Sequence, residues 1–241
     1  MSDYSEIVLA DAPIGYWRCD DPSGDLLDSS GANRTATKTG GNITYQIAPL
    51  IANDTDKALQ CDTVEGANSF SCAAYPTSYP NGCAIELWFM RYADGGRSTG
   101  TLFELGDIAL RLDDYQSNLG GARLSVIVSG TIENRVAYNE THHLVVNFKS
   151  NSERKIYLNN VVLFSQPITA ALTYNKIRML YYLTTTVTDE IALYDKPLTP
   201  AQVAAHYYYG TGAWVRPRGA SRKPGRPVFN PAIHSIHATG V

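Results

Sequence analysis

Glu86 is the acidic residue whose surroundings most resemble those of a catalytic carboxyl. It lies in the run AIELWFM, residues 84–90, where alternation places Ala84, Trp88 and Met90 on the same strand face. A retaining glycoside hydrolase needs two carboxyl groups about 5–5.5 Å apart across the sugar bond. This face offers no second acid, so we expect a protein that is not an enzyme unless another strand supplies one.

Two adjacent acids, Asp189 and Glu190, begin the stretch DEIALY. Ile191 and Leu193 alternate with Glu190 across it, which is the period of a half-buried strand. Acidic residues that flank turns are common in proteins. We therefore interpret this pair as turn and strand-end residues rather than as catalysts.

Histidines and cysteines indicate no metal centre. His142 and His143 are neighbours on one strand, so their side chains point to opposite faces, and we expect a strand-end pair. His206 is expected at the surface or edge of a helix. The four cysteines contain no Cys-x-x-Cys, which argues against zinc. Reduced thiols are favoured, and two disulfides stay open: Cys61–Cys83 or Cys72–Cys83.

The elements that would position these side chains are mostly strands. The chain has 241 residues, of which 44% are hydrophobic and 16 are tyrosines. Apolar runs at 84–90, 123–128, 142–148 and 178–183 are separated by turn signals. In KIYLNNVVLF, residues 155–164, the two central asparagines suit a two-residue type I′ hairpin turn. This spacing predicts a β-sandwich or jelly roll rather than a βαβ fold.

Two short helices are predicted, one near each end of this strand-rich region. Residues 3–10 begin with the Asp-x-x-Glu spacing of a capping box. Residues 199–210 begin with Thr-Pro-Ala-Gln, a capping box with proline at the first helical position, and end in glycine. The expected buried stripe of the second helix has three- and four-residue spacing: Val203, Ala204 and Tyr207.

Residues 211–241 differ in charge and pattern from the rest of the chain. Residues 1–210 carry 15 basic and 23 acidic residues, a net −8, while the last 31 carry five basic residues and no acid, which sums to −3. We expect one domain over 1–210 and a basic, Pro-rich extended docking arm over 211–241 that orders on binding a partner. The expected docking residues are basic contacts and apolar anchors: Trp214, Arg216, Arg218, Arg222, Lys223, Arg226, Phe229 and Ile233.

Membrane and nucleic-acid partners are not expected. No run reaches 18 apolar residues, and the N-terminus lacks the basic region and apolar run of a secretory signal. We therefore expect the chain to fold in a cytosol. The 1–210 region is acidic and the arm lacks interleaved aromatic residues, which argues against binding to nucleic acid.

Five motifs follow one another along the chain: YSEIVLADAPIGYWRCDD, AIELWFM, HHLVVNF, KIYLNN and DEIALYDKPLTPAQVAAHY. In this order they resemble laminin-G-like, concanavalin A-like domains of bacteriophage and bacterial surface proteins, over roughly residues 4–210. Two departures are Asn160, where glycine is usual, and Thr141, where tryptophan often precedes the histidine. The resemblance implies an all-β antiparallel β-sandwich jelly roll with short N- and C-terminal helices, to which the extended C-terminal arm is added.

A protein of this fold could carry two kinds of ligand site, one for calcium and one for a sugar. No cofactor is expected to be required, but related folds often hold calcium with loop oxygens, and the candidate hard ligands are Asp20, Asp21, Asp28 and Asp189. A sugar site would combine aromatic rings with polar groups in loops, although tyrosines also fill sheet rims. The candidate sugar-binding residues are Tyr75, Tyr79, Tyr92, Asp94, Tyr115 and Asn118.

The resemblance suggests a bacteriophage virion structural protein, either a capsid decoration protein or a minor tail component. It would be made in the host cytoplasm, present in several copies or as a homo-oligomer, and anchored to other virion proteins by its arm. Its sandwich could bind cell-surface glycans for host adhesion. Two alternatives stay open: a soluble bacterial carbohydrate-binding module or lectin, and a glycan hydrolase that depends on Glu86.

Overall fold

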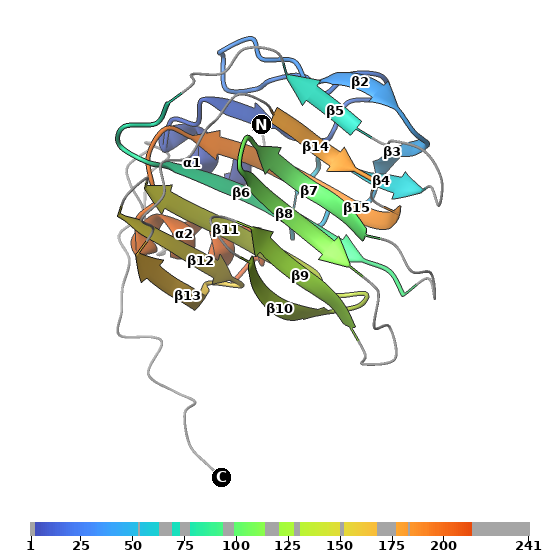
Figure 1. Ribbon diagram of the computed structural model, residues 1–241. Coiled ribbons are helices and arrows are strands. Elements are labelled where there is room, and N and C mark those ends of the chain that lie inside the picture. The colour runs from blue at the N-terminus through green and yellow to red at the C-terminus, as the bar shows by residue number, and fades with distance from the viewer. Residues whose placement is uncertain are drawn as a thin grey trace.

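The fold is an antiparallel β-sandwich with two short helices, as the computed structural model shows (Figure 1). This confirms the predicted fold class. The structure describes residues 3–52, 54–62, 69–72, 78–93, 99–113, 121–127, 131–149, 152–167, 177–182 and 184–213.

Two sheets form the layers of the sandwich, and every strand pair in them is antiparallel. The eight-stranded sheet has the order β13 (Val161–Pro167), β12 (Glu153–Leu158), β11 (Thr141–Lys149), β6 (Cys83–Arg91), β15 (Thr184–Tyr194), β4 (Ala58–Asp62) and β3 (Ile43–Ile47), with β1 (Gly15–Trp17) paired to β15. The seven-stranded sheet has the order β10 (Thr131–Ala137), β9 (Gly121–Ile127), β8 (Ile108–Asp113), β7 (Thr99–Leu105), β14 (Ile177–Tyr181), β5 (Ser69–Cys72) and β2 (Thr37–Gly40).

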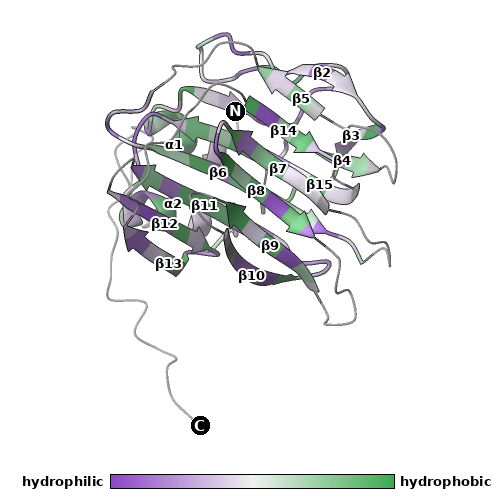
Figure 2. Cartoon of the chain, viewed as in Figure 1, coloured by the Kyte–Doolittle hydropathy of each residue, from purple (hydrophilic) through white to green (hydrophobic). Residues whose placement is uncertain are grey.

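The main core lies between the two sheets. Ile85, Leu87 and Phe89 of β6 are fully buried in it, as their alternation predicts. The polar residues of β10, at one edge of the seven-stranded sheet, make that strand largely purple in Figure 2. Cys19, Cys61, Cys72 and Cys83 are buried as free thiols, so the structure contains neither of the disulfides left open by the sequence.

A second core lies on the outer face of the eight-stranded sheet, under helices α1 (Asp3–Ala10) and α2 (Pro200–Gly210). Tyr4 and Val8 of α1 and Val203 of α2 pack there against Trp88 and Tyr194. This face of β6 therefore carries buried residues as well, which explains why nearly the whole strand is buried.

Local sequence signals account for the ends of these elements. Thr199 and Gln202 form the predicted capping box of α2, each side chain bonded to the other residue's backbone N–H. Asn159 and Asn160 have φ values of 51° and 64°, as a type I′ turn requires. Val203 and Ala204 of the predicted α2 stripe are buried, but Tyr207 is half-buried, and Ala205 and His206 are buried instead.

Gly210 allows α2 to approach the sheet closely. A Cβ atom at this position would overlap the indole ring of Trp88. We expect Gly210→Ala to destabilise the domain by about 1–3 kcal/mol, because the rigid ring or the helix must shift. Thermal unfolding of the variant measures this cost, and Ala201→Ser on the exposed side of α2 serves as the control. An unchanged melting temperature in Gly210→Ala would show that the helix end yields freely.

Neither helix in the described part of the chain is long and apolar enough to cross a membrane. The predicted docking residues Trp214 to Ile233 lie outside the described residues, so the arm remains a prediction.

Candidate functional site

Glu86 stands at the centre of a buried polar network between β6 and the two helices. Its carboxylate accepts hydrogen bonds from the hydroxyls of Tyr4 at 3.1 Å and Tyr194 at 2.7 Å. His143 Nε2 lies 2.7 Å from Oε1, and His206 Nδ1 lies 2.9 Å from both carboxylate oxygens. Neither Glu86 nor the two histidines has any exposed side-chain surface.

The electrostatics of this network favour a charged pair. Burial alone would raise the pKa of Glu86, but the charge of His206 and the bonds from both histidines hold that pKa well below its usual range. Burial alone would lower the pKa of His206, but Glu86 and Asp11 raise it to about 9. Burial keeps the pKa of His143 below its ordinary value. At neutral pH the network therefore holds a Glu86 carboxylate, a cationic His206 and a neutral His143.

This geometry corrects the expectation for His206, which is completely buried and links Glu86 to Asp11 at 3.1 Å, so it is not a surface or edge residue. His142 and His143 lie near the start of β11 on opposite faces, as expected. His143 joins the network, whereas His142 contacts the Ala137 carbonyl at 3.1 Å. Glu86 is enclosed and its oxygens are occupied, so the arrangement stabilises the fold and leaves no access for a substrate.

A second buried acidic group surrounds Asp189 and Glu190. These residues were expected at a strand end, but they lie inside β15 and are each 1% exposed. The register shifts between Asp189, which pairs with Trp88, and Ala192, which pairs with Glu86. Glu190 is the bulged residue, at φ 53°. The bulge overrides strict alternation and turns both carboxyls to the outer face of the sheet.

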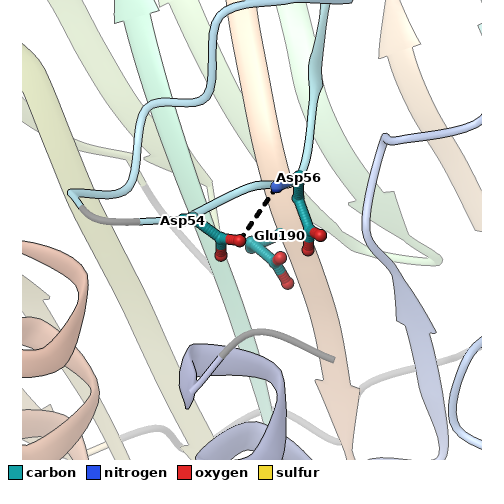
Figure 3. A group of neighbouring side chains, drawn as sticks. All are labelled: Asp54, Asp56 and Glu190. Carbon is teal, nitrogen blue, oxygen red and sulfur yellow. Dashed lines mark hydrogen bonds between the residues drawn. The ribbon is translucent and has the colours of Figure 1, made fainter.

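Asp54 and Asp56, from the segment that leads into β4, meet Glu190 there (Figure 3). One carboxylate oxygen from each of the three residues lies within 4.8 Å of the others. The Asp56 N–H donates to Asp54 at 3.0 Å, which fixes the turn between them. Arg18 contacts Asp56 and lies 3.7 Å from Glu190 and 3.5 Å from Asp20.

Burial makes ionisation of this group costly. It raises the pKa of Asp189 to about 8, although the Leu50 N–H donates to that carboxyl at 3.0 Å. Burial and the neighbouring Asp189 charge also raise the pKa of Glu190, and they outweigh the Tyr16 hydroxyl that donates to it.

The four aspartates predicted as calcium ligands do not converge. Asp28 accepts backbone N–H groups from Tyr16, Ser30 and Arg34, and Asp21 accepts one from Leu27, so both shape loops. Asp20 and Asp189 adjoin the acidic group instead. Within the described residues, the group with converging ligand atoms is the one formed by Asp54, Asp56 and Glu190.

The predicted sugar-binding residues are only partly described. Tyr79 is 3% exposed and packs in the main core, which corrects its assignment because its ring cannot reach a ligand. Tyr92 is half-buried at the end of β6. The remaining four lie outside the described residues: Tyr75, Asp94, Tyr115 and Asn118.

An unpredicted polar row crosses the outer face of the seven-stranded sheet. Tyr181, Thr101, Arg111, Ser125 and Glu133 are successive register partners on β14, β7, β8, β9 and β10, which lie side by side in Figure 1. In the described part of the chain both helices cover the other sheet, so no helix lies over this row.

Arg111 is exposed at the middle of this row, and the described residues give it no hydrogen bond or ion pair. On either side the charges are paired: Arg178 lies 3.0 Å from Glu104, and Arg123 lies 3.0 Å from Glu133. The Arg178 guanidinium stacks over Tyr181 at 4.3 Å. An exposed guanidinium that has no partner among the described residues can bind an anionic ligand.

The sequence analysis predicted neither the row around Arg111 nor the acidic group formed by Asp54, Asp56 and Glu190. Arg111 interrupts the apolar run IALRL at an outward position, a local signal that single-strand alternation could have shown. Asp54 and Asp56 form an Asp-x-Asp loop pattern, but nothing in the sequence connects it to Glu190, more than 130 residues away.

The two sheets and the two helices define an antiparallel β-sandwich. No protein-family model matches this chain, and no curated protein matches it. Solved structures do share the fold. The receptor binding domain of botulinum neurotoxin D matches 83% of this chain with a TM-score of 0.60 and 12% identity. The botulinum neurotoxin serotype G binding domain matches 81% with a TM-score of 0.58 and 14% identity.

A structure of botulinum neurotoxin type C, whose cell entry is dependent upon interaction with two ganglioside molecules, matches 85% of this chain with a TM-score of 0.60 and 10% identity. This chain spans about half the length of these structures: 53% of the D domain, 50% of the G domain and 55% of the type C chain. At such low identity the similarity establishes the fold alone.

Proposed function

We propose that this chain is a non-enzymatic bacteriophage virion structural protein whose sandwich binds cell-surface glycans for host adhesion. The observation that carries the binding role is the row around Arg111, whose side chain is exposed on a sheet face that neither helix of the described chain covers. The burial of Glu86 supports a role without catalysis, because that carboxyl cannot reach a substrate. The folds of the neurotoxin binding domains are consistent with a receptor-binding sandwich.

The glycan class follows from the chemistry of the row. The planar guanidinium of Arg111 is suited to a carboxylate, with which it forms two parallel hydrogen bonds. Thr101 and Ser125, its register neighbours on either side, are buried, so the exposed Arg111 guanidinium is the group of this row that a ligand would meet. These features favour an acidic sugar over a neutral one.

We expect Arg111→Ala to weaken binding of the full chain to carboxylated glycans by about tenfold to a hundredfold, because a charge-assisted hydrogen bond contributes roughly 1.5–3 kcal/mol. A glycan array with acidic and neutral sugars, followed by titration calorimetry on the best ligand, measures this loss. Lys196→Ala removes an exposed charge elsewhere and should leave affinity unchanged. Equal binding by both variants, or preference for neutral sugars, would contradict the assignment of this row.

The virion role rests on the resemblance and on the basic arm, residues 211–241. We propose that the arm anchors several copies of the protein to capsid or tail proteins after synthesis in the host cytoplasm. Particles that lack the protein should rebind the full chain but not residues 1–210. Equal rebinding by both would remove the anchoring role. If 1–210 binds glycans while neither form binds particles, a soluble bacterial lectin or carbohydrate-binding module becomes the better description.

A further inference from the structure

The strands at the ends of the two sheets differ in how they are protected against further strand pairing. In the described part of the chain these are β13 and β3 of the eight-stranded sheet and β10 and β2 of the seven-stranded sheet. An end strand has backbone N–H and C=O groups without a partner in its own sheet. Proteins protect such an edge with charged side chains, with a short strand or with a covering segment.

Three of these four strands carry protection of this kind. β10 contains Glu133 and Arg135, and β2 is four residues long and contains Lys38. β3 is five residues long, and its register with β4 is irregular. The Tyr45 hydroxyl of β3 also donates to the Gly24 carbonyl at 2.6 Å, which ties this strand to the loop before β2.

β13 is the end strand with the least protection. It is seven residues long, VVLFSQP, and contains no charged residue. Val161 and Val162 are 62% and 49% exposed, and they are two of the four large hydrophobic side chains exposed in the described residues. Leu163 has no register partner on β12, and Pro167 ends the strand, so both limit the length that can pair. The two valines remain open, and an uncharged apolar edge is a template for another strand.

The charges nearest to β13 are paired within the protein. Glu153 of β12 lies 3.3 Å from Lys155 Nζ and accepts a hydrogen bond from the Ser165 hydroxyl at 2.8 Å. The Arg154 guanidinium stacks over the Phe164 ring at 5.0 Å. The edge therefore offers little to a highly charged partner. An uncharged strand with exposed apolar side chains is the complementary occupant, and β13 itself is such a strand.

We propose that β13 pairs antiparallel with β13 of a second copy of this chain, so that the two eight-stranded sheets become one continuous sheet. A twofold axis relates the two copies, and the same strand therefore serves on both sides of the interface. The pairing supplies partners to the open backbone groups and removes Val161 and Val162 of both copies from water.

This pairing also sets the direction in which the two copies face. Antiparallel neighbours are related by a twofold axis perpendicular to the sheet, so both copies turn the same face to the same side. The helices pack on the outer face of the eight-stranded sheet, whereas the row around Arg111 lies on the outer face of the other sheet. The dimer directs both rows to one side, where, if the proposed function holds, they bind a glycan-bearing surface together.

The test follows the full chain over a range of concentrations. Sedimentation equilibrium from about 1 μM to about 1 mM should show a reversible monomer–dimer equilibrium, because one strand pair buries less than about 1,200 Å² and such interfaces are weak. Backbone amide hydrogen exchange should slow in β13 as the concentration rises and stay constant in β10. A monomer over the whole range overturns the proposal. Protection of β13 at every concentration also overturns it, since a segment of the same chain would then cover the edge.

Variants locate the interface. Val162→Lys places a lysine on the edge of both copies and should raise the dissociation constant by about tenfold or more. Val162→Thr keeps the branched shape and should weaken the dimer less, which gives a second reading if the lysine variant does not fold. Thr131→Lys, at the exposed start of β10, is the matched control and should dimerise as the wild type does. Equal dimerisation by Val162→Lys and Thr131→Lys overturns the proposal.

Binding of a soluble acidic glycan separates this inference from the proposed function. Val162→Lys leaves Arg111 in place on the other sheet, so it should bind such a glycan with the affinity of the wild type. A wild type that dimerises through β13 but binds no glycan would contradict the proposed function and leave the interface standing. A wild type that binds the glycan but stays a monomer would overturn the interface alone.

Discussion

Glu86→Ala should destabilise the domain by about 3–5 kcal/mol, because removal of one member of a buried ion pair leaves its partner uncompensated. His206 would keep a buried charge next to an empty space, and the hydroxyls of Tyr4 and Tyr194 would lose their acceptor. For a chain of this size the melting temperature should fall by roughly 10 °C. Urea unfolding followed by tryptophan fluorescence gives the free energy, and scanning calorimetry gives the temperature.

Two further variants sharpen this result. Glu86→Gln keeps the shape but not the charge, so it should cost less than the alanine variant. Glu153→Ala removes an acid whose side chain is 51% exposed, and its effect should stay within about 1 kcal/mol. If Glu86→Ala melted within about two degrees of the wild type, a difference below about 1 kcal/mol, the network would not be the main tie between the helices and the sheet.

The pair His206 and Glu86 should also give the domain a marked pH dependence. His206 has its pKa raised from 6.5 to about 9 in the folded state, so its contribution is complete below pH 6.5 and is lost as the pH rises through about 9. A shift of this size corresponds to about 3 kcal/mol. Glu86 has a lowered pKa, so its contribution is present above pH 4.5 and is lost as the pH falls.

Comparison with a His206 variant separates the pH-dependent stability that His206 contributes from that of the other titrating groups. The groups that face His206 are Glu86, Asp11 and the Tyr4 ring. The stability difference between wild type and His206→Gln should shrink steadily between pH 6.5 and pH 9. His142→Gln, which removes a histidine that contacts Ala137 and Asn159 instead, is the matched variant for comparison. A constant difference for His206→Gln would show that this histidine is not charged in the folded state.

The local sequence determined most of the secondary structure. The alternation in residues 84–90 predicted which face of β6 lies in the main core, and Asn159-Asn160 predicted the hairpin between β12 and β13. The capping box at Thr199 predicted the start of α2. These features depend on side-chain period and on backbone preferences of neighbouring residues, so they can be read without knowledge of the rest of the chain.

Only the tertiary structure decided which residues meet. His206 was expected at the surface or edge of its helix, yet Glu86 lies 120 residues earlier and binds it in the core. One bulged residue at Glu190 placed a pair expected at a strand end inside β15, where Glu190 meets Asp54 and Asp56. The row around Arg111 required the register of five strands. Long-range pairing sets these contacts, and no local pattern encodes a partner's position.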